Sequence, residues 1–290
     1  MRLVTYSMDG KEQLGVIVGR GIVSISSHIA DAPGNMIDLM QRWCEFAEPV
    51  RELLNRPPDV ELASVRLHAP VPKPGKVLAI GLNYKDHIAE VGMETPEHQT
   101  WFAKMPTSVT GPYDPVEMPD VSQSLDYEAE LVMIIGKRAR NVPRSRAAEV
   151  IFGFCVGNDV SVRDWQLRVS QWVVGKSFDT HAPFGPWLTT ADEVDPGDLA
   201  IRCLVNGEVR QSSNTKHLLF DCFAQVELLS KAMTLEPGDV IFTGTPSGVG
   251  MSYKPPVYLK AGDVVRVEID TLGHIENRVE AGSTQIVIGC

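Results

Sequence analysis

The first seventy residues alternate between short apolar runs and glycine turns. The runs cover residues 2–7 and 13–26, and an Asp-Gly pair and an Arg-Gly pair interrupt them, which predicts short β-strands joined by tight turns. Over residues 36–55 the apolar side chains instead recur every three or four positions, which predicts a helix. A cluster of prolines follows, so we place a boundary near residue 70.

After this boundary the pattern is mainly that of strands. Apolar runs predict a buried strand over residues 76–84, a short helical or lid segment over residues 86–93, and a second buried strand over residues 124–136. Nearer the C-terminus, an Asn-Gly pair and two Gly-Asp pairs separate further apolar runs and predict hairpin turns. We therefore expect a β-dominated α+β fold, with a small N-terminal β-rich module over residues 1–70 and a main domain over residues 71–290.

Charge and the lack of long apolar runs narrow the classes of partner. The chain has 290 residues with 27 basic and 37 acidic side chains, a net charge of −10. Such a surface disfavours nucleic acid and anionic membranes as partners, although local charge can still bind a small anionic substrate. The N-terminus has no signal-like apolar region, and no apolar run reaches about 18 residues. We therefore expect a cytoplasmic protein with no membrane partner.

The cysteines are odd in number, widely spaced and form no Cys-X-X-Cys pair. This spacing argues against a disulfide framework or a zinc site and predicts reduced thiols. The five residues are Cys44, Cys155, Cys203, Cys222 and Cys290.

Two glutamates interrupt the second buried strand. Glu128 and Glu130 are two residues apart, so their side chains lie on the same face of a strand. Apolar residues on both faces indicate that this strand is buried. Two buried carboxylates side by side repel each other and lose hydration, which is costly unless a positive group lies between them or one of them is protonated.

A divalent cation is the positive group that we favour. The simpler alternative is a solvated strand edge that exposes Asp126 together with the two glutamates. Mg²⁺, Mn²⁺ and Ca²⁺ all bind carboxylate oxygens, and a third oxygen ligand is then expected elsewhere in the chain. Asp159, at the end of another apolar run, is the candidate for it. The predicted ligands are Glu128, Glu130 and Asp159.

A histidine and a glutamate share one face of the predicted lid segment. His87 and Glu90 are three residues apart, so a helical turn brings them together. A carboxylate beside an imidazole orients the ring and raises its basicity, as a general base that activates water requires. The alternative is an ordinary surface contact between the two side chains.

A lysine in an apolar stretch is the candidate catalytic cation. Gly175-Lys176-Ser177 resembles the end of a phosphate-binding loop, but that motif needs a glycine at the position of Ser170. We therefore interpret Lys176 as a charge that neutralises a carboxylate or an enolate.

A glycine-rich stretch after residue 243 does not match the dinucleotide-binding motif, because Tyr253 stands where the third glycine should be. We expect a tight turn that offers backbone N–H groups and the Thr245 hydroxyl to a carboxylate. A plain hairpin turn is the alternative.

Seven motifs in this order together resemble the fumarylacetoacetate hydrolase family, over roughly residues 70–280. They are GLNYKDHIAE, DYEAELVMIIGK, GNDVSVRDWQ, GKSFDTHAPFGPWL, VNGEVRQ, PGDVIFTGTPSGVG and LKAGDVVRVEIDTLGHIEN. The resemblance implies the mixed β-roll of that family, a homodimer, and a Mg²⁺ or Mn²⁺ site. It also implies a small anionic 2-oxo acid as the substrate, as in aromatic catabolism.

The resemblance also implies roles for individual residues. Glu128, Glu130 and Asp159 match the metal ligands, Lys176 matches the active-site lysine, and His87 and Glu90 match the lid dyad; Arg163, Gln166 and Thr245 match positions that line the substrate pocket. Fumarylacetoacetase itself has a further aspartate before the lid, where this chain has Asn83. This departure favours the smaller bacterial-type members of the family.

The expected reaction is hydrolysis of a C–C bond in a 2,4-dioxo acid of the acylpyruvate type, through an enolate that the cation stabilises. The same site could instead serve a 2-hydroxymuconate-type isomerase or an oxaloacetate decarboxylase, because all three reactions share the enolate. The non-enzymatic alternative is a metal-stabilised binding module.

Overall fold

Most strands of the computed structural model, which describes residues 1–284 and 286–289, belong to one mixed sheet. The order of strands across it is β4-β3-β2-β1-β14-β12-β11-β17-β6-β7, with β5 paired to β1 and β8 to β14. The bounds are β1 (Arg2–Met8), β2 (Lys11–Val18), β3 (Gly21–Ser24), β4 (Val60–Glu61), β5 (Arg66–Leu67), β6 (Val77–Gly81), β7 (Thr100–Lys104), β8 (Val109–Thr110), β11 (Ala129–Ile135), β12 (Ile151–Asn158), β14 (Ala182–Thr190) and β17 (Val240–Phe242).

A second sheet has the order β16-β15-β18-β19-β9, and β10 pairs with β13 alone. Their bounds are β9 (Val116–Met118), β10 (Leu125–Asp126), β13 (Ser161–Val162), β15 (Ala200–Val205), β16 (Glu208–Asn214), β18 (Val264–Ile269) and β19 (Gly273–Ala281). The largest apolar cluster, which includes Leu131, Phe154 and Val267, fills the space between the two sheets. Burial of these apolar side chains is the main force that holds the sheets together.

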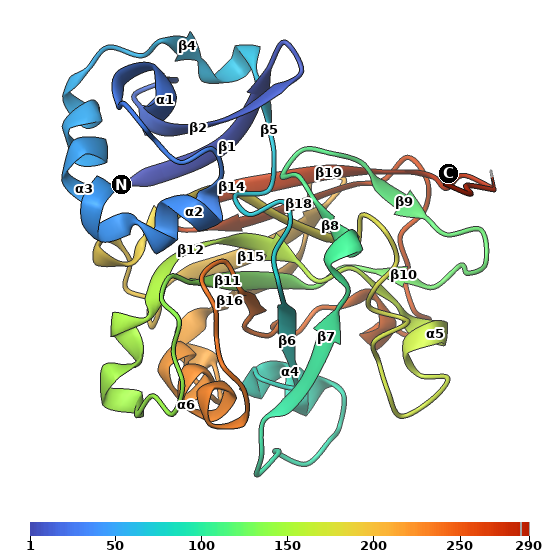
Figure 1. Cartoon of the computed structure of the whole chain (residues 1–290). Coiled ribbons are helices and arrows are strands. Elements are labelled where there is room, and N and C mark those ends of the chain that lie inside the picture. The colour runs from blue at the N-terminus through green and yellow to red at the C-terminus, as the bar shows by residue number, and fades with distance from the viewer. Residues whose placement is uncertain (285, 290) are drawn as a thin grey trace.

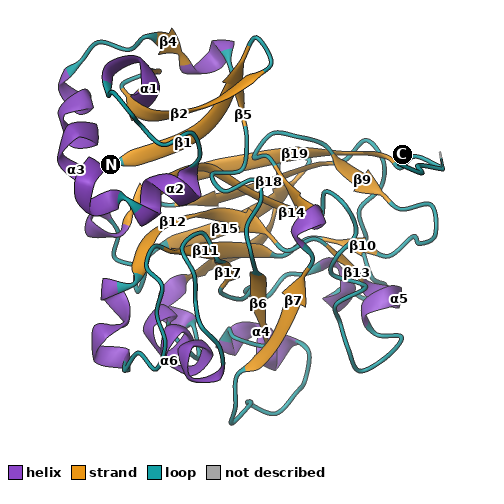
Figure 2. Ribbon diagram, viewed as in Figure 1, coloured by secondary structure: helices purple, strands orange, loops and turns teal. Residues whose placement is uncertain are grey.

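Helices lie around the edges of the sheets (Figure 2). They are α1 (Ile25–His28), α2 (Met36–Gln41), α3 (Trp43–Glu52), α4 (Lys85–Glu90), α5 (Arg163–Gln166) and α6 (Cys222–Ala232). The observed content is β-dominated with helices in the minority, which confirms the expected fold class.

The N-terminal strands extend the main sheet. The predicted short strands and the predicted helix are present as β1–β3 and as α2 with α3. Strand β1 pairs antiparallel with β14, so Leu3 lies opposite Leu188 and the first strands continue the sheet of the main domain (Figure 1). The boundary near residue 70 falls in the stretch between β5 and β6 and stays a prediction.

Two expectations about the strands were wrong in detail. The strand predicted over residues 124–136 is two strands, β10 and β11, because the N–H of Tyr127 donates to the side chain of Asp126 and the N–H of Glu128 donates to the side chain of Asn158, and these bonds interrupt the backbone ladder. Of the three turns predicted nearer the C-terminus, the Asn206-Gly207 turn forms a hairpin, between β15 and β16. The two Gly-Asp pairs instead lie directly before β17 and β18. Neither strand pairs with the strand that precedes it in the sequence, so neither Gly-Asp pair closes a hairpin.

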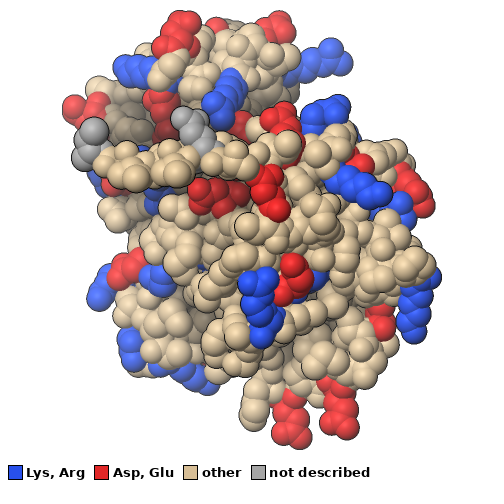
Figure 3. Space-filling view, turned by 90° about the vertical axis from the view of Figure 1, so that its right-hand side faces the viewer, with Lys and Arg blue, Asp and Glu red and all other residues tan. Residues whose placement is uncertain are grey.

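The charged side chains on the face shown in Figure 3 are interspersed in sign. None of the helices in the described residues is long and apolar enough to cross a membrane. The four cysteines within the described residues are free thiols, as expected, and Cys290 lies outside these residues.

His181, just before β14, is a fully buried histidine that the sequence patterns did not single out. Its Nε2 donates to the carbonyl of Glu117 at 2.8 Å, and Nδ1 is buried without a hydrogen-bond partner. Burial lowers the pKa of His181 to about 3, and the charge of Lys104 acts in the same direction. The ring is therefore neutral in the folded protein down to strongly acidic pH.

Acidification is therefore expected to destabilise the protein through His181. The folded pKa lies below the unfolded value of about 6.5, so the unfolded state takes up a proton that the folded state does not, and stability falls as pH falls below about 6.5. By pH 5 this amounts to about 2 kcal/mol, at 1.36 kcal/mol per pKa unit. Denaturant unfolding of the wild type and of His181→Phe at pH 7 and pH 5 measures it. The variant should lose about 2 kcal/mol less than the wild type, and equal losses would contradict the assignment.

Candidate metal centre

Three carboxylates from two neighbouring strands converge at one end of the main sheet. Glu128 lies in the break between β10 and β11, Glu130 lies on β11, and Asp159 directly follows β12. Strands β11 and β12 are antiparallel neighbours with Ala129 opposite Asn158, and the N–H of Asp159 donates to the carbonyl of Glu128. Oxygens of the three carboxylates lie within 4.8 Å of one another, and all three side chains are buried. The predicted trio is thus assembled, and burial rules out a solvated strand edge.

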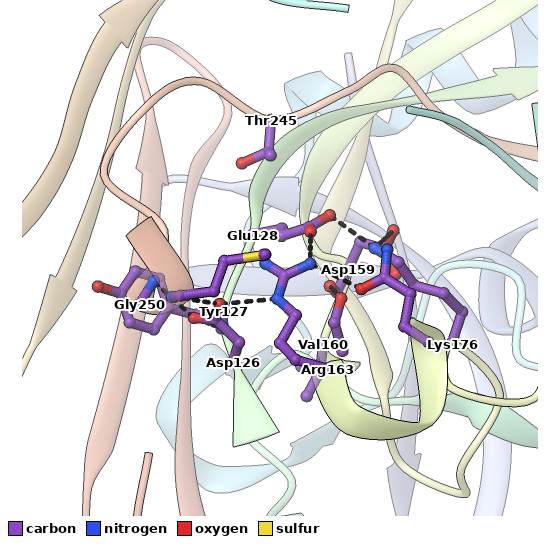
Figure 4. Close-up of polar contacts among 12 residues, drawn as sticks. Asp126, Tyr127, Glu128, Asp159, Val160, Arg163, Lys176, Thr245 and Gly250 are labelled. Atoms are coloured by element: carbon purple, nitrogen blue, oxygen red, sulfur yellow. Dashed lines mark hydrogen bonds and ion pairs between the residues drawn. The ribbon is translucent and has the colours of Figure 1, made fainter. Parts of the chain in front are cut away.

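Two buried lysines bind two of these carboxylates. Nζ of Lys176 lies 2.7 Å from Oε2 of Glu128 and 2.7 Å from Oδ2 of Asp159 (Figure 4). Nζ of Lys104, at the end of β7, lies 2.6 Å from Oδ1 of Asp159. Both oxygens of Asp159 are therefore held by ammonium groups, as the interpretation of Lys176 as a charge-neutralising cation predicts.

Arg163, in α5, connects the trio to a fourth buried carboxylate. Its Nε donates to Oδ2 of Asp126 at 2.8 Å, and its Nη1 donates to Oε1 of Glu128 at 2.5 Å and to Oε1 of Gln166 at 2.9 Å. Asp126 in turn accepts the N–H groups of Gly250 and Met251, so it fixes the guanidinium against the glycine loop (Figure 4). These pairings explain how so many charges can be buried together.

The charges leave one carboxylate without a cation. Burial by itself would raise the pKa of Glu128, but Lys176 and Arg163 hold it at about 2. Burial, together with the charges of Asp159 and Glu128, raises the pKa of Glu130 well above its usual range. Glu130 accepts the N–H of Gly244 at 2.6 Å and has no ion-pair partner within the described residues.

A divalent cation fits this donor set. Three buried carboxylates close together supply the oxygen ligands that Mg²⁺ and Mn²⁺ prefer. A cation beside Glu130 would also remove the electrostatic cost of its negative charge. The trio therefore suits a hard dication better than a fourth protein side chain.

The predicted lid dyad is formed in helix α4. Nδ1 of His87 lies 3.2 Å from Oε2 of Glu90, and the other oxygen of Glu90 accepts the N–H of Gly248 at 2.8 Å. Burial alone would raise the pKa of Glu90, but these hydrogen bonds lower it, so the group is a carboxylate at neutral pH. Asp86, next to His87, accepts hydrogen bonds from Ser213 and Ser247. The helix is thus tied to the glycine loop at two points.

The glycine loop that follows β17 uses its backbone N–H groups as predicted. Gly244 donates to Glu130, Gly248 to Glu90 and Gly250 to Asp126, so each donates to a carboxylate of the site. A Cβ on Gly244, whose φ is +105°, would lie 2.7 Å from Asn83. The hydroxyl of Thr245 accepts a hydrogen bond from Gln211 at 2.8 Å and lies apart from the ion-pair network (Figure 4).

One cavity of about 250 Å³ brings most of the predicted site residues together. Its polar wall consists of His87, Glu128, Arg163, Gln166, Lys176 and Thr245. Its other wall is apolar and includes Phe102, Trp172 and Met251. Glu90, Glu130 and Asp159 are not part of its lining, but Glu90 contacts His87 and Asp159 contacts Lys176, which both are.

The sequence analysis missed two charged members of the site, Lys104 and Asp126, the carboxylate that holds Arg163. Lys104 ends a strand that was not predicted, and no sequence signal distinguishes it from a lysine exposed to solvent. Asp126 stands close to the two glutamates, but it was considered only as part of a solvated strand edge. Asn83 contacts no carboxylate of the trio: its side chain bonds to backbone groups of Phe220 and Thr243 and so anchors the start of the lid.

The chain is similar to solved structures over nearly its whole length. Maleylpyruvate hydrolase from Sphingobium sp. SYK-6, solved in complex with manganese(II) and pyruvate, is 35% identical with a TM-score of 0.83 over 98% of this chain and 100% of that one. The 5-carboxymethyl-2-hydroxymuconate delta-isomerase from Mycobacterium smegmatis is 36% identical with a TM-score of 0.78 over 98% of this chain and 100% of that one.

The chain is also similar to curated sequences and matches a family model. The mitochondrial oxaloacetate tautomerase fahd2 of Xenopus laevis is 42% identical over 287 residues, which cover 96% of this chain and 90% of that protein. The profile of the family described as fumarylacetoacetate (FAA) hydrolase C-terminal matches residues 76–280. The chain belongs to the fumarylacetoacetate hydrolase family.

Proposed function

We propose that the protein is a Mg²⁺- or Mn²⁺-dependent enzyme that hydrolyses a C–C bond in small 2,4-dioxo acids of the acylpyruvate type. The observation that carries this proposal is the buried trio of Glu128, Glu130 and Asp159 behind a cavity that His87 also lines. When bound at the trio, a divalent cation supplies Lewis-acid stabilisation to the enolate that C–C cleavage produces. A binding module would need the trio but not the base beside it.

The proposed general base is His87. Glu90 is ionised and only accepts hydrogen bonds, so in the neutral form of the His87 ring the proton lies on Nδ1 and Nε2 keeps its lone pair. His87 lines the cavity, where Nε2 would take a proton from water as the water attacks the distal carbonyl. Glu90 is a positioning residue that fixes the tautomer.

The proposed substrate-binding groups are cations already held in place. Nη2 of Arg163 is buried in the cavity wall and has no hydrogen-bond partner among the described residues, so it is free to donate to a substrate carboxylate. Lys176 would add positive charge where the enolate oxygen forms. Gln166 and Thr245 complete the polar wall.

The second candidate reaction is keto–enol tautomerisation of oxaloacetate. The 42% identity to an oxaloacetate tautomerase favours it. Physically it needs the same cation and the same base, because His87 would move a proton to or from the carbon beside the 2-oxo group without attack by water. Isomerisation of an unsaturated diacid and decarboxylation of oxaloacetate would use the same enolate.

Product analysis distinguishes these reactions. Acetylpyruvate and oxaloacetate are incubated with the metal-loaded protein and then with EDTA, while ultraviolet absorbance and pyruvate are both measured. A hydrolase releases pyruvate from acetylpyruvate; a tautomerase speeds the loss of the enol absorbance of oxaloacetate without pyruvate. No metal-dependent change with either acid would refute both candidates and leave the binding module.

The homodimer and the cytoplasmic location stay predictions, and light scattering of the purified protein tests the first.

A further inference from the structure

A loop whose two ends lie against each other contributes part of the apolar wall of the cavity. Residues 167–174 follow α5, and Gly175, where the loop returns, lies against the backbone of Gln166. A Cβ on Gly175 would lie 2.3 Å from the backbone nitrogen of Gln166, so only glycine fits. The carbonyl of Gly175 also accepts the N–H of Val162 at 2.9 Å. The two ends of the loop, Gln166 and Gly175, are therefore held together.

Trp172, in this loop, is held against the cavity by three contacts. Its indole lies on the backbone of Gly81 at the end of β6, where a Cβ would be 2.5 Å from the ring. The indole meets the ring of Phe102 edge to face, with centroids 5.5 Å apart. The carbonyl of Trp172 accepts the N–H of Lys176 at 3.1 Å. These contacts fix the indole relative to the catalytic lysine.

The wall that contains Trp172 begins at the charged end of the cavity. The ring of Phe102 has its centroid 4.9 Å from Nζ of Lys176 and also packs edge to face with Trp172, so it connects the two. A substrate whose 2-oxo acid group lies by Lys176 would therefore extend its chain along Phe102 towards the indole. The cavity volume of about 250 Å³ is also below the range of about 300–1,000 Å³ that is typical of sites for larger organic ligands.

We propose that Trp172 sets the upper limit on substrate length, so that the cavity accepts short-chain 2-oxo acids and rejects longer ones. This inference rests on the proposed function, because it takes the charged end of the cavity to bind the 2-oxo acid group. A chain that reaches the indole must displace it from Gly81 and Phe102. Selectivity of about tenfold or more per methylene group is typical where an apolar pocket has a rigid end.

Direct binding tests the inference without turnover. Titration calorimetry in the presence of Mn²⁺ compares pyruvate, 2-oxobutyrate, 2-oxohexanoate and 2-oxooctanoate. For the wild type, affinity should fall by about tenfold or more once the chain reaches the indole. Trp172→Ala should restore the affinity for the two long acids by at least about tenfold relative to pyruvate, and Trp172→Phe should lie between the two.

A tryptophan outside the cavity provides the matched control. Trp43 packs on Phe152, with ring centroids 4.9 Å apart, and Trp43→Ala should keep the wild-type order of affinities. Trp172→Phe retains a ring against Gly81, which gives a folded variant even if Trp172→Ala unfolds. An unchanged order in the Trp172 variants would overturn the inference alone. Failure of the wild type to bind any of the acids would overturn the proposed function with it.

Discussion

A Glu130→Gln variant is expected to lose divalent-cation binding and, with it, turnover. Glu130 is the carboxylate of the trio that no lysine or arginine pairs with, and its amide analogue can still accept the N–H of Gly244. Changes to groups that merely support metal ligands cost about 10–100-fold in affinity, so removal of a charged ligand should cost about 100-fold or more. Calorimetric titration with Mn²⁺ and with Mg²⁺ measures this loss.

Thermodynamic stability gives an independent readout of the same variant. A ligand at 1,000 times its Kd stabilises the folded protein by about 4.1 kcal/mol, whereas a 100-fold weaker ligand at the same concentration contributes about 1.4 kcal/mol. Without metal, Glu130→Gln should be at least as stable as the wild type, because the repulsion from Glu128 and Asp159 is removed. The matched control is the same change at an exposed glutamate, Glu149→Gln, which should bind metal as the wild type does. Equal metal affinity in Glu130→Gln and the wild type would defeat the ligand assignment.

The trio could be predicted because burying it is costly. Glu128 and Glu130 stand two residues apart in a strand that is apolar on both faces, and burying them together is costly unless a positive group lies between them or one of them is protonated. The prediction needed no knowledge of pairing between strands. Adding Asp159 was a weaker step, which the register of β11 on β12 now explains.

The parts that could not be predicted depend on contacts between distant residues. The side chain of Asp126 accepts N–H groups more than 120 residues away, and no local pattern contains that information. Lys104 reaches Asp159 only because β7 pairs with β6, and β7 itself has no clear alternation. The place of Trp172 in the cavity wall likewise depends on its contact with the distant Gly81, which no local pattern predicts. The clustering of the two glutamates and the pairing of His87 with Glu90 could thus be predicted from local sequence, whereas the walls and supports of the site could not.

Replacing His87 with alanine is expected to slow turnover by about 10²-fold or more while it leaves metal binding intact. The imidazole lines the cavity and contacts Glu90, but none of its described hydrogen bonds reaches the carboxylate trio. Loss of the ring therefore removes the base and not the cation site. Steady-state assays with the preferred 2-oxo acid and calorimetry with Mn²⁺, on the same preparation, measure the two properties separately.

Glu90→Gln distinguishes the role of the base from that of its support. An amide can still contact His87 and Gly248, but it no longer holds the ring proton on Nδ1 by charge, so kcat should fall by less than in His87→Ala while KM changes little. His217→Ala, a change of an exposed histidine outside the cavity, should behave as the wild type. If His87→Ala retained full turnover, proton transfer would have to be assigned to another group in the cavity wall. Lys176 and Arg163 hold the pKa of Glu128 at about 2, which makes this carboxylate a weak base, and Lys176 is the other candidate there. Its two ion pairs with Glu128 and Asp159 favour the protonated form, which makes it a poor base and leaves His87 as the assignment that the geometry supports.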